Sequence, residues 1–150
     1  MLRQTAILAA VTALLKSKYG SYPVYTNEII EGFKQPCFFV KLIRRTDTET
    51  VNINGNSLSI IITYFADPAA NKEIAYLNMT DDLSQLFNVG FKAGDRYLHT
   101  KAFTADRIGE KQDILQITIQ IDYLDDTGRG DSNAGYDIMK NLNEKLIVTI

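Results

Sequence analysis

The side chains best suited to nucleophilic catalysis are the single cysteine and the single histidine of the chain, Cys37 and His99. A reactive cysteine needs a neighbouring base or a helix N-terminus that lowers the pKa of its thiol. Cys37 follows Pro36 and precedes Phe38 and Phe39, so none of its sequence neighbours activates it. An unactivated free cysteine usually behaves as a small buried hydrophobic residue. We therefore expect a structural Cys37, an exposed His99 on a strand and no catalytic residue.

Motifs for metals and cofactors are also missing from the sequence. One cysteine and one histidine are too few ligands for a typical zinc site. The acidic pair Asp125–Asp126 begins a polar segment that lacks the spacing of a calcium-binding loop. The phosphate-binding patterns GxxxxGKS, GxxxxGKT and GxGxxG and the nucleophile elbow GxSxG do not occur. We expect no metal and no cofactor, and an enzymatic role would require Cys37 to react faster with a thiol reagent in the folded state than in the unfolded state.

The bulk composition describes one mildly acidic globular domain. The chain has 150 residues, of which 45% are hydrophobic and 23% are charged, and its formal net charge is -2. A nucleic-acid-binding module is more often basic, because phosphate neutralisation supplies most of the non-specific affinity. The sequence has no run of about 18 apolar residues, the length that a transmembrane helix needs. We therefore expect a protein made in the cytoplasm, without an internal disulfide, a membrane contact or dedicated nucleic-acid binding.

Two segments have the apolar period of an amphipathic helix. In residues 2–18 the apolar side chains recur along one helical face, and these are Ile7, Leu8, Val11, Leu14 and Leu15. A second helix is predicted over residues 72–88, with Asn71 as a suitable N-cap. Each helix is expected to bury its apolar stripe against a sheet.

Four longer strands are expected to form two hairpins. Residues 37–45 and 58–65 are rich in aromatic and branched side chains, and the polar tip between them, residues 46–56, contains the turn signal Asn54–Gly55. The second pair is predicted at residues 97–108 and 115–123, around a turn at 109–113. The last strand has a strict alternation of apolar and polar side chains, which indicates one buried face and one wet face. Residues 22–26 are expected to be short and extended, and Gly90 and Gly94 to bound a loop.

The predicted order of elements is α-β-β-α-β-β, followed by a C-terminal extension. Hairpins rather than βαβ crossovers indicate an α+β fold, with an antiparallel sheet of two hairpins and two helices packed on one face. We expect the folded domain over residues 1–127, and a linker and C-terminal interaction segment over residues 128–150. The end of this segment is apolar and β-prone, at Leu146, Ile147, Val148 and Ile150. A strand of this kind needs a sheet edge, in the same chain or in a neighbour.

The N-terminal third of the chain carries a family resemblance. Its residues are Tyr22-Pro23-Val24-Tyr25, Gly32-Phe33 and Pro36-Cys37-Phe38-Phe39-Val40, with weaker matches at Tyr64-Phe65 before Asp67, at Asp122-Tyr123, and at Met139 and Leu142. In these positions the chain resembles the small tail terminator, or tail completion, proteins of phages and phage-like elements of Gram-positive bacteria. The resemblance extends over most of the chain and depends on packing residues.

The resemblance implies a structural virion protein with an α+β fold. Tail terminators form a ring, typically a hexamer, that caps the head-proximal end of the tail tube, stops its elongation and docks the head-tail connector. The implied partners are further copies of the chain, tube and sheath subunits, the connector and passing DNA, and the implied location is the virion tail after assembly in the host cytoplasm. Another tail or connector subunit, such as a head-tail joining or tube protein, remains the alternative. Contractile, non-contractile and headless particles all remain open.

The candidate assembly contacts are few. Arg44 and Arg45 are the only adjacent basic pair, and we expect them to face passing DNA or an acidic partner ring. We expect a sheet edge and the helix flanks to contact neighbouring copies. The terminal segment that contains Leu146, Ile147, Val148 and Ile150 is expected to cross to a neighbour by strand addition.

Overall fold

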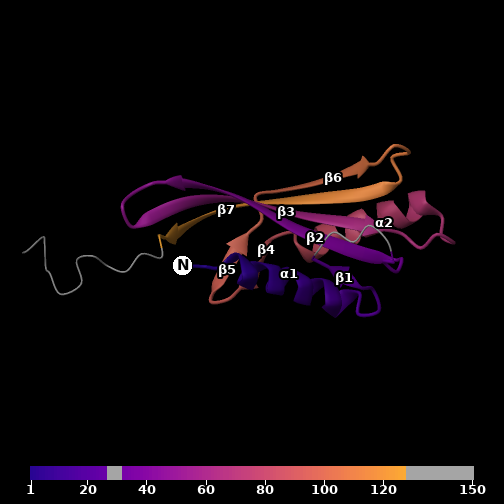
Figure 1. Ribbon diagram of the computed structural model, residues 1–150, viewed down its shortest axis with the longest axis horizontal. Helices are drawn as coiled ribbons and strands as arrows, with labels where there is room; N and C mark the ends of the chain where they lie inside the picture. Colours follow the sequence, from indigo (N-terminus) through magenta and orange to yellow (C-terminus); the bar gives the residue numbers. More distant parts are fainter. Residues whose placement is uncertain (27–31, 128–150) are drawn as a thin grey trace, which may run out of the picture.

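The computed structural model describes residues 1–26 and 32–127, which form a five-stranded sheet, a two-stranded sheet and two helices (Figure 1). In chain order the elements are α1 (Gln4–Lys18), β1 (Val24–Tyr25), β2 (Cys37–Thr48), β3 (Ile53–Phe65), α2 (Lys72–Leu86), β4 (Gly90–Ala93), β5 (Arg96–His99), β6 (Ala102–Ile108) and β7 (Ile114–Asp126). Two helices and a mostly antiparallel sheet confirm the predicted α+β class. The predicted linker and terminal strand, residues 128–150, lie outside the described residues.

The main sheet has the strand order β1-β2-β3-β7-β6. β2, β3, β7 and β6 run antiparallel to their neighbours, but β1 runs parallel to β2. The prediction of a purely antiparallel sheet was therefore wrong at this edge. At this edge the N–H of Phe38 donates a hydrogen bond to the carbonyl of Pro23, which joins the extended residues after α1 to the start of β2.

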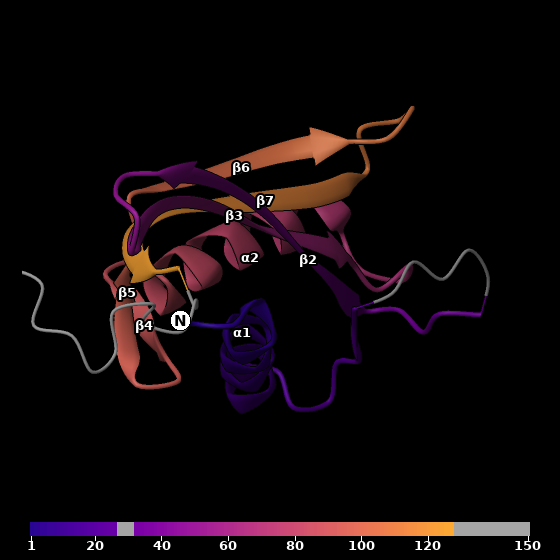
Figure 2. The same cartoon turned by 60° about the vertical axis from the view of Figure 1, so that its left-hand side comes forward.

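Alternation along the three central strands produces the core. Val40 in β2 is opposite Ile62 in β3, which is opposite Ile117 in β7, and all three side chains are buried. β7 confirms the predicted alternation, with buried apolar side chains from Leu115 to Tyr123. Both helices lie on the same side of the sheet (Figure 2), and their buried residues join this core; these are Ile7, Val11 and Leu15 of α1 and Tyr76, Met79 and Leu83 of α2.

The helices begin and end close to the predicted positions. α1 lacks only the first two residues of the predicted range. At the start of α2, Asn71 Oδ1 accepts a hydrogen bond from the N–H of Ile74 at 3.5 Å, which confirms the N-cap. The helix ends two residues earlier than predicted, at Leu86. Within the described residues, no helix is both long enough and apolar enough to cross a membrane.

The β2–β3 hairpin is longer than predicted and turns at a different place. β2 ends at Thr48 and β3 begins at Ile53, so the chain reverses over residues 49–52. The predicted turn, Asn54–Gly55, is instead part of β3 and pairs with the end of β2 on one side and with β7 on the other. Thr50 makes the turn, because its hydroxyl oxygen accepts hydrogen bonds from two of the backbone N–H groups that follow it.

The strand predicted over residues 97–108 is two strands in different sheets. β5 pairs with β4, whereas β6 pairs with β7. The chain changes sheet at Thr100, whose hydroxyl donates a hydrogen bond to the carbonyl of Phe87 at 2.6 Å. Residues 90–94 were predicted as a loop but contain β4, and Gly94, with a φ of 57°, makes the turn into β5.

Candidate assembly site

The face of the main sheet that points away from the helices carries no helix among the described residues (Figure 2), and we call it the outer face. It consists of alternate residues of the paired strands, such as Lys41, Ile61 and Thr118, which lie side by side in one row. Polar and apolar side chains are mixed on it, and Ile43 is 49% exposed. The outer face is therefore a mixed polar and apolar surface that no described helix covers.

Cys37 lies on the outer face but is fully buried. The ring of Phe33 packs against Phe39 and Phe65, with ring centres 5.5 and 5.0 Å away, and Phe65 is the cross-strand neighbour of Cys37. Burial raises the pKa of the Cys37 thiol to about 11, so the thiol is protonated at neutral pH. A protonated thiol without solvent access is a poor nucleophile. This environment supports the structural role expected for Cys37.

The pleat of β2 separates Arg44 from Arg45. Arg44 is half-buried and stands opposite Leu58, in a row whose side chains point toward the core. Arg45 points to the outer face, is exposed, and has its Nε 3.3 Å from Oδ1 of Asp47. Side chains on opposite faces of a strand cannot both contact one flat partner surface. The expected contact with DNA or an acidic ring stays a prediction, and only Arg45 is available to a partner on the outer face.

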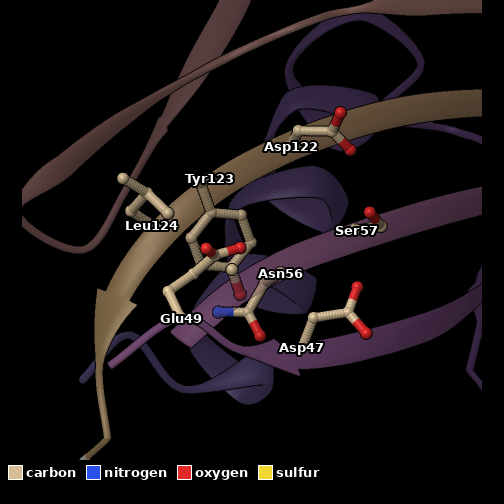
Figure 3. A pocket seen from close by; sticks show the side chains of 8 residues that line it. Asp47, Glu49, Asn56, Ser57, Asp122, Tyr123 and Leu124 are labelled. Atoms are coloured by element: carbon tan, nitrogen blue, oxygen red, sulfur yellow. The ribbon is translucent and has the colours of Figure 1, made fainter. Parts of the chain in front are cut away.

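The outer face is hollowed at the end next to the β2–β3 turn. Figure 3 shows the carboxylates of Asp47 in β2, Glu49 in the turn and Asp122 in β7 around this hollow. Carboxylates around one small space favour a cationic partner where cations of the same chain do not already neutralise them. The hollow has a volume of about 340 Å³ and is lined by Asp47, Glu49, Gly55, Asn56, Ser57, Asp122, Tyr123 and Leu124.

Two of the three carboxylates have cations beside them. Arg45 lies beside Asp47, as described above. Lys101 Nζ lies 2.7 Å from Asp122 Oδ2, and this cation holds the pKa of Asp122 below its ordinary value. Glu49 makes no ion pair with any described residue. Its carboxylate lies over Gly55, where an added Cβ would stand 2.8 Å from Glu49 Oε1. The missing side chain at Gly55 therefore makes room for the Glu49 carboxylate.

Asp125 joins the end of β7 to the rest of the domain. It is buried, accepts a hydrogen bond from the N–H of Leu2, and has its Oδ1 3.3 Å from Arg96 Nη1. The guanidinium of Arg96 also lies over the ring of Tyr123, 5.4 Å from the ring centre. These contacts fix the β4–β5 hairpin to the end of the sheet. In the part of the chain that the structure describes, no group of three His, Cys, Asp or Glu side chains could hold a metal ion.

With this geometry established, comparison with known proteins identifies the family. The model of the phage tail terminator protein family matches residues 6–146. The chain belongs to the phage tail terminator family. This tail terminator protein is therefore a structural protein of the virion tail, where it assembles with other tail components. No curated protein sequence matches the chain.

A solved structure shares the fold of this tail terminator protein. A chain from a structure described as the virion of a native gene transfer agent particle superposes with a TM-score of 0.52 at 15% identity, over 79% of this chain and 92% of that chain. At this identity the likeness shows the fold alone. A second solved structure reaches a TM-score of 0.45 at 15% identity, over 87% of this chain and 100% of that chain, a similarity too low to support an argument.

The sequence-predicted contacts and the hollow do not coincide. Arg45 lies on the outer face near the hollow, whereas Leu146, Ile147, Val148 and Ile150 lie outside the described residues. The hollow was missed because its residues come from separate segments, and each acidic residue alone is typical of a solvated surface. The one available signal was the alternation of β7, which places Asp122 on the wet face.

Proposed function

We propose that this tail terminator protein forms a ring, a hexamer, that caps the head-proximal end of the tail tube, stops its elongation and docks the head-tail connector. The observation that carries the proposal is the family match over residues 6–146. The buried, protonated Cys37 supports a role without catalysis. The resemblance to proteins from Gram-positive hosts stays a prediction.

The open edges of the main sheet support a ring. A head-to-tail contact repeated by rotation needs two different surfaces on each subunit, and it closes into a ring when the rotations sum to a full turn. β6 ends the sheet on one side, and on the other side β1 pairs only with Phe38 and Phe39 of β2. Among the described residues, neither β6 nor residues 41–48 of β2 has a further strand beside it. We place contacts between copies at these edges and at the helix flanks.

The terminal segment, residues 136–150, crosses to a neighbouring copy in this proposal and adds a strand to one of these edges. The chain leaves β7 beside the β2–β3 turn, because the N–H of Thr127 donates a hydrogen bond to the carbonyl of Asn52 at 2.9 Å. The apolar residues Leu146, Ile147, Val148 and Ile150 supply the contact. Light scattering of a chain without residues 136–150 should show a smaller oligomer than the full chain, and an unchanged mass would overturn the strand exchange.

The β2–β3 tip, residues 46–56, faces the tube or the DNA exit in this proposal. Arg44 and Arg45 lie at its base, and Arg45, which is exposed on the outer face, provides the positive charge for passing DNA or for an acidic partner ring. The formal net charge of -2 argues against tight DNA binding, so the contact with DNA is transient.

An elongation assay tests the capping function directly. Tube subunits of the same particle are polymerised with increasing amounts of this protein, and tube lengths are measured by electron microscopy. A cap shortens the tubes in proportion to its amount and is found at one end only. Incorporation along the whole tube would instead identify a tube subunit, and binding to the connector without any effect on tube length would identify a head-tail joining protein.

A further inference from the structure

Two surfaces at one end of the subunit differ in charge and share an apolar character. The first, which we call the tip patch, consists of the acidic hollow with Glu49 and the exposed apolar side chains of the β2–β3 turn and of the strands that border the hollow. Val51, Ile53 and Leu124 are 73%, 41% and 60% exposed. Ile53 and Leu124 lie on the two strands that border the hollow. The tip patch is therefore an acidic and apolar surface.

The second surface, which we call the hairpin patch, is the outward side of β4 and β5. This hairpin buries Phe91 and Leu98 in the core, so the alternate residues point away from it. Lys92 is directly opposite Tyr97, and the ring of His99 packs against Tyr97 with ring centres 5.0 Å apart. Tyr97 is 49% exposed, and the preceding Val89 is 64% exposed. Lys92 makes no ion pair with any described residue, so the hairpin patch is a basic and apolar surface.

The two patches lie at the same end of the subunit but on different sides. The ion pair between Arg96 in β5 and Asp125 in β7 fixes the small hairpin to the sheet end at which the hollow lies. Figure 2 shows the β4–β5 hairpin on the helix side of the main sheet, whereas the tip patch is on the outer face. One copy therefore cannot bring its own two patches together. The hairpin patch of a copy that lies beside it in the same orientation can reach its tip patch.

We propose that the tip patch of one copy binds the hairpin patch of the next copy of this chain. Lys92 enters the hollow opposite Glu49, and Tyr97 packs against Leu124. The contact pairs a carboxylate and an amine that have no ion-pair partner within the described subunit, and it removes exposed apolar surface from water. A contact between two different surfaces repeats around a ring. This inference rests on the proposed ring and adds the residues that hold neighbouring copies together. It assigns Glu49, Val51 and Ile53 of the tip to the neighbouring copy and leaves Arg45, at the base of the tip, for the tube or the DNA exit.

Charge reversal tests the contact with full-length protein in sedimentation velocity. Glu49→Lys alone and Lys92→Glu alone each place like charges together, and the protein concentration for half-assembly is expected to rise about tenfold or more. An equimolar mixture of the two variants restores assembly, because alternating copies then pair unlike charges at every contact of an even-numbered ring. The double variant Glu49→Lys, Lys92→Glu restores it as well. Glu110→Lys and Lys111→Glu, exposed residues of the β6–β7 turn, are matched controls with no expected effect.

The outcomes separate this inference from the proposed ring. Restoration in the mixture and in the double variant supports the contact. Single variants that assemble like the wild type overturn the contact and leave the ring unaffected. Single variants that are impaired, and are rescued neither by the mixture nor by the double variant, also overturn the contact, because Glu49 and Lys92 then meet other partners. A wild-type protein that stays monomeric at every concentration overturns both the ring and the contact. Circular dichroism of each variant shows that the fold is retained.

Discussion

Thiol labelling of Cys37 is expected to be slower in the folded protein than in the unfolded chain. The side chain is fully buried, and burial raises the pKa of the thiol from 9.0 to about 11. A difference of two pKa units reduces the thiolate fraction at pH 8 about a hundredfold. A thiolate of higher pKa is intrinsically more nucleophilic, by about tenfold for this difference. Ionisation alone therefore predicts a rate about tenfold lower in the folded state.

Steric protection lowers the rate further, because Cys37 has no solvent exposure and its sulfur is reached only when the structure around it opens. The assay follows an aromatic disulfide reagent by absorbance at pH 8, with and without a denaturing concentration of urea. Leu77→Cys in a Cys37→Ala background is the control, because Leu77 is 54% exposed and its cysteine should react at similar rates in both states. A folded Cys37 that reacts as fast as the unfolded chain, or faster, would show an activated thiol and refute the structural role.

Three further predictions concern stability and are measured by urea denaturation. Ile62→Ala removes a fully buried side chain from the central strand and should lower the free energy of unfolding by about 2–5 kcal/mol. Ile61→Ala on the outer face is the control and should lower it clearly less. Equal losses of stability would contradict the assigned faces. Asn71→Ala removes the N-cap of α2 and should lower the free energy of unfolding by about 1 kcal/mol. An unchanged stability would mean that the cap hydrogen bond does not stabilise the fold. The ion pair with Arg107 lowers the pKa of Glu73 below 4.5, so the stability from this pair is present above that pH and is lost as the pH falls through the lowered pKa. The difference in free energy of unfolding between the wild type and Glu73→Gln should therefore shrink in acid. A difference that grows in acid would reverse the assigned sign.

The local sequence pattern was sufficient to predict a strand and its orientation where one face of the strand is buried. The alternation in β7 predicted both the strand and the face that enters the core, because every second side chain must leave water. The Asn71 cap was equally local, since one side chain and one nearby N–H suffice. The α+β class followed from the order of such elements.

Features that depend on a third strand or a distant residue were not predictable in this way. Asn54–Gly55 is a good turn signal, but pairing with β7 keeps it extended and moves the turn to Thr50. The change of sheet at Thr100 depends on the carbonyl of Phe87, thirteen residues earlier. The parallel β1 required knowledge of how the chain after α1 returns to the sheet. The hollow likewise exists only once β2 and β7 flank β3, because Asp47 and Asp122 come from the two outer strands of that trio.

Electron microscopy of the purified full chain shows whether this tail terminator protein closes into a ring. We expect closed rings of uniform size with a central opening wide enough for DNA, and no growth into longer structures as the protein concentration rises. Open filaments or tubes of variable length would contradict it, because a contact that does not close continues to add subunits.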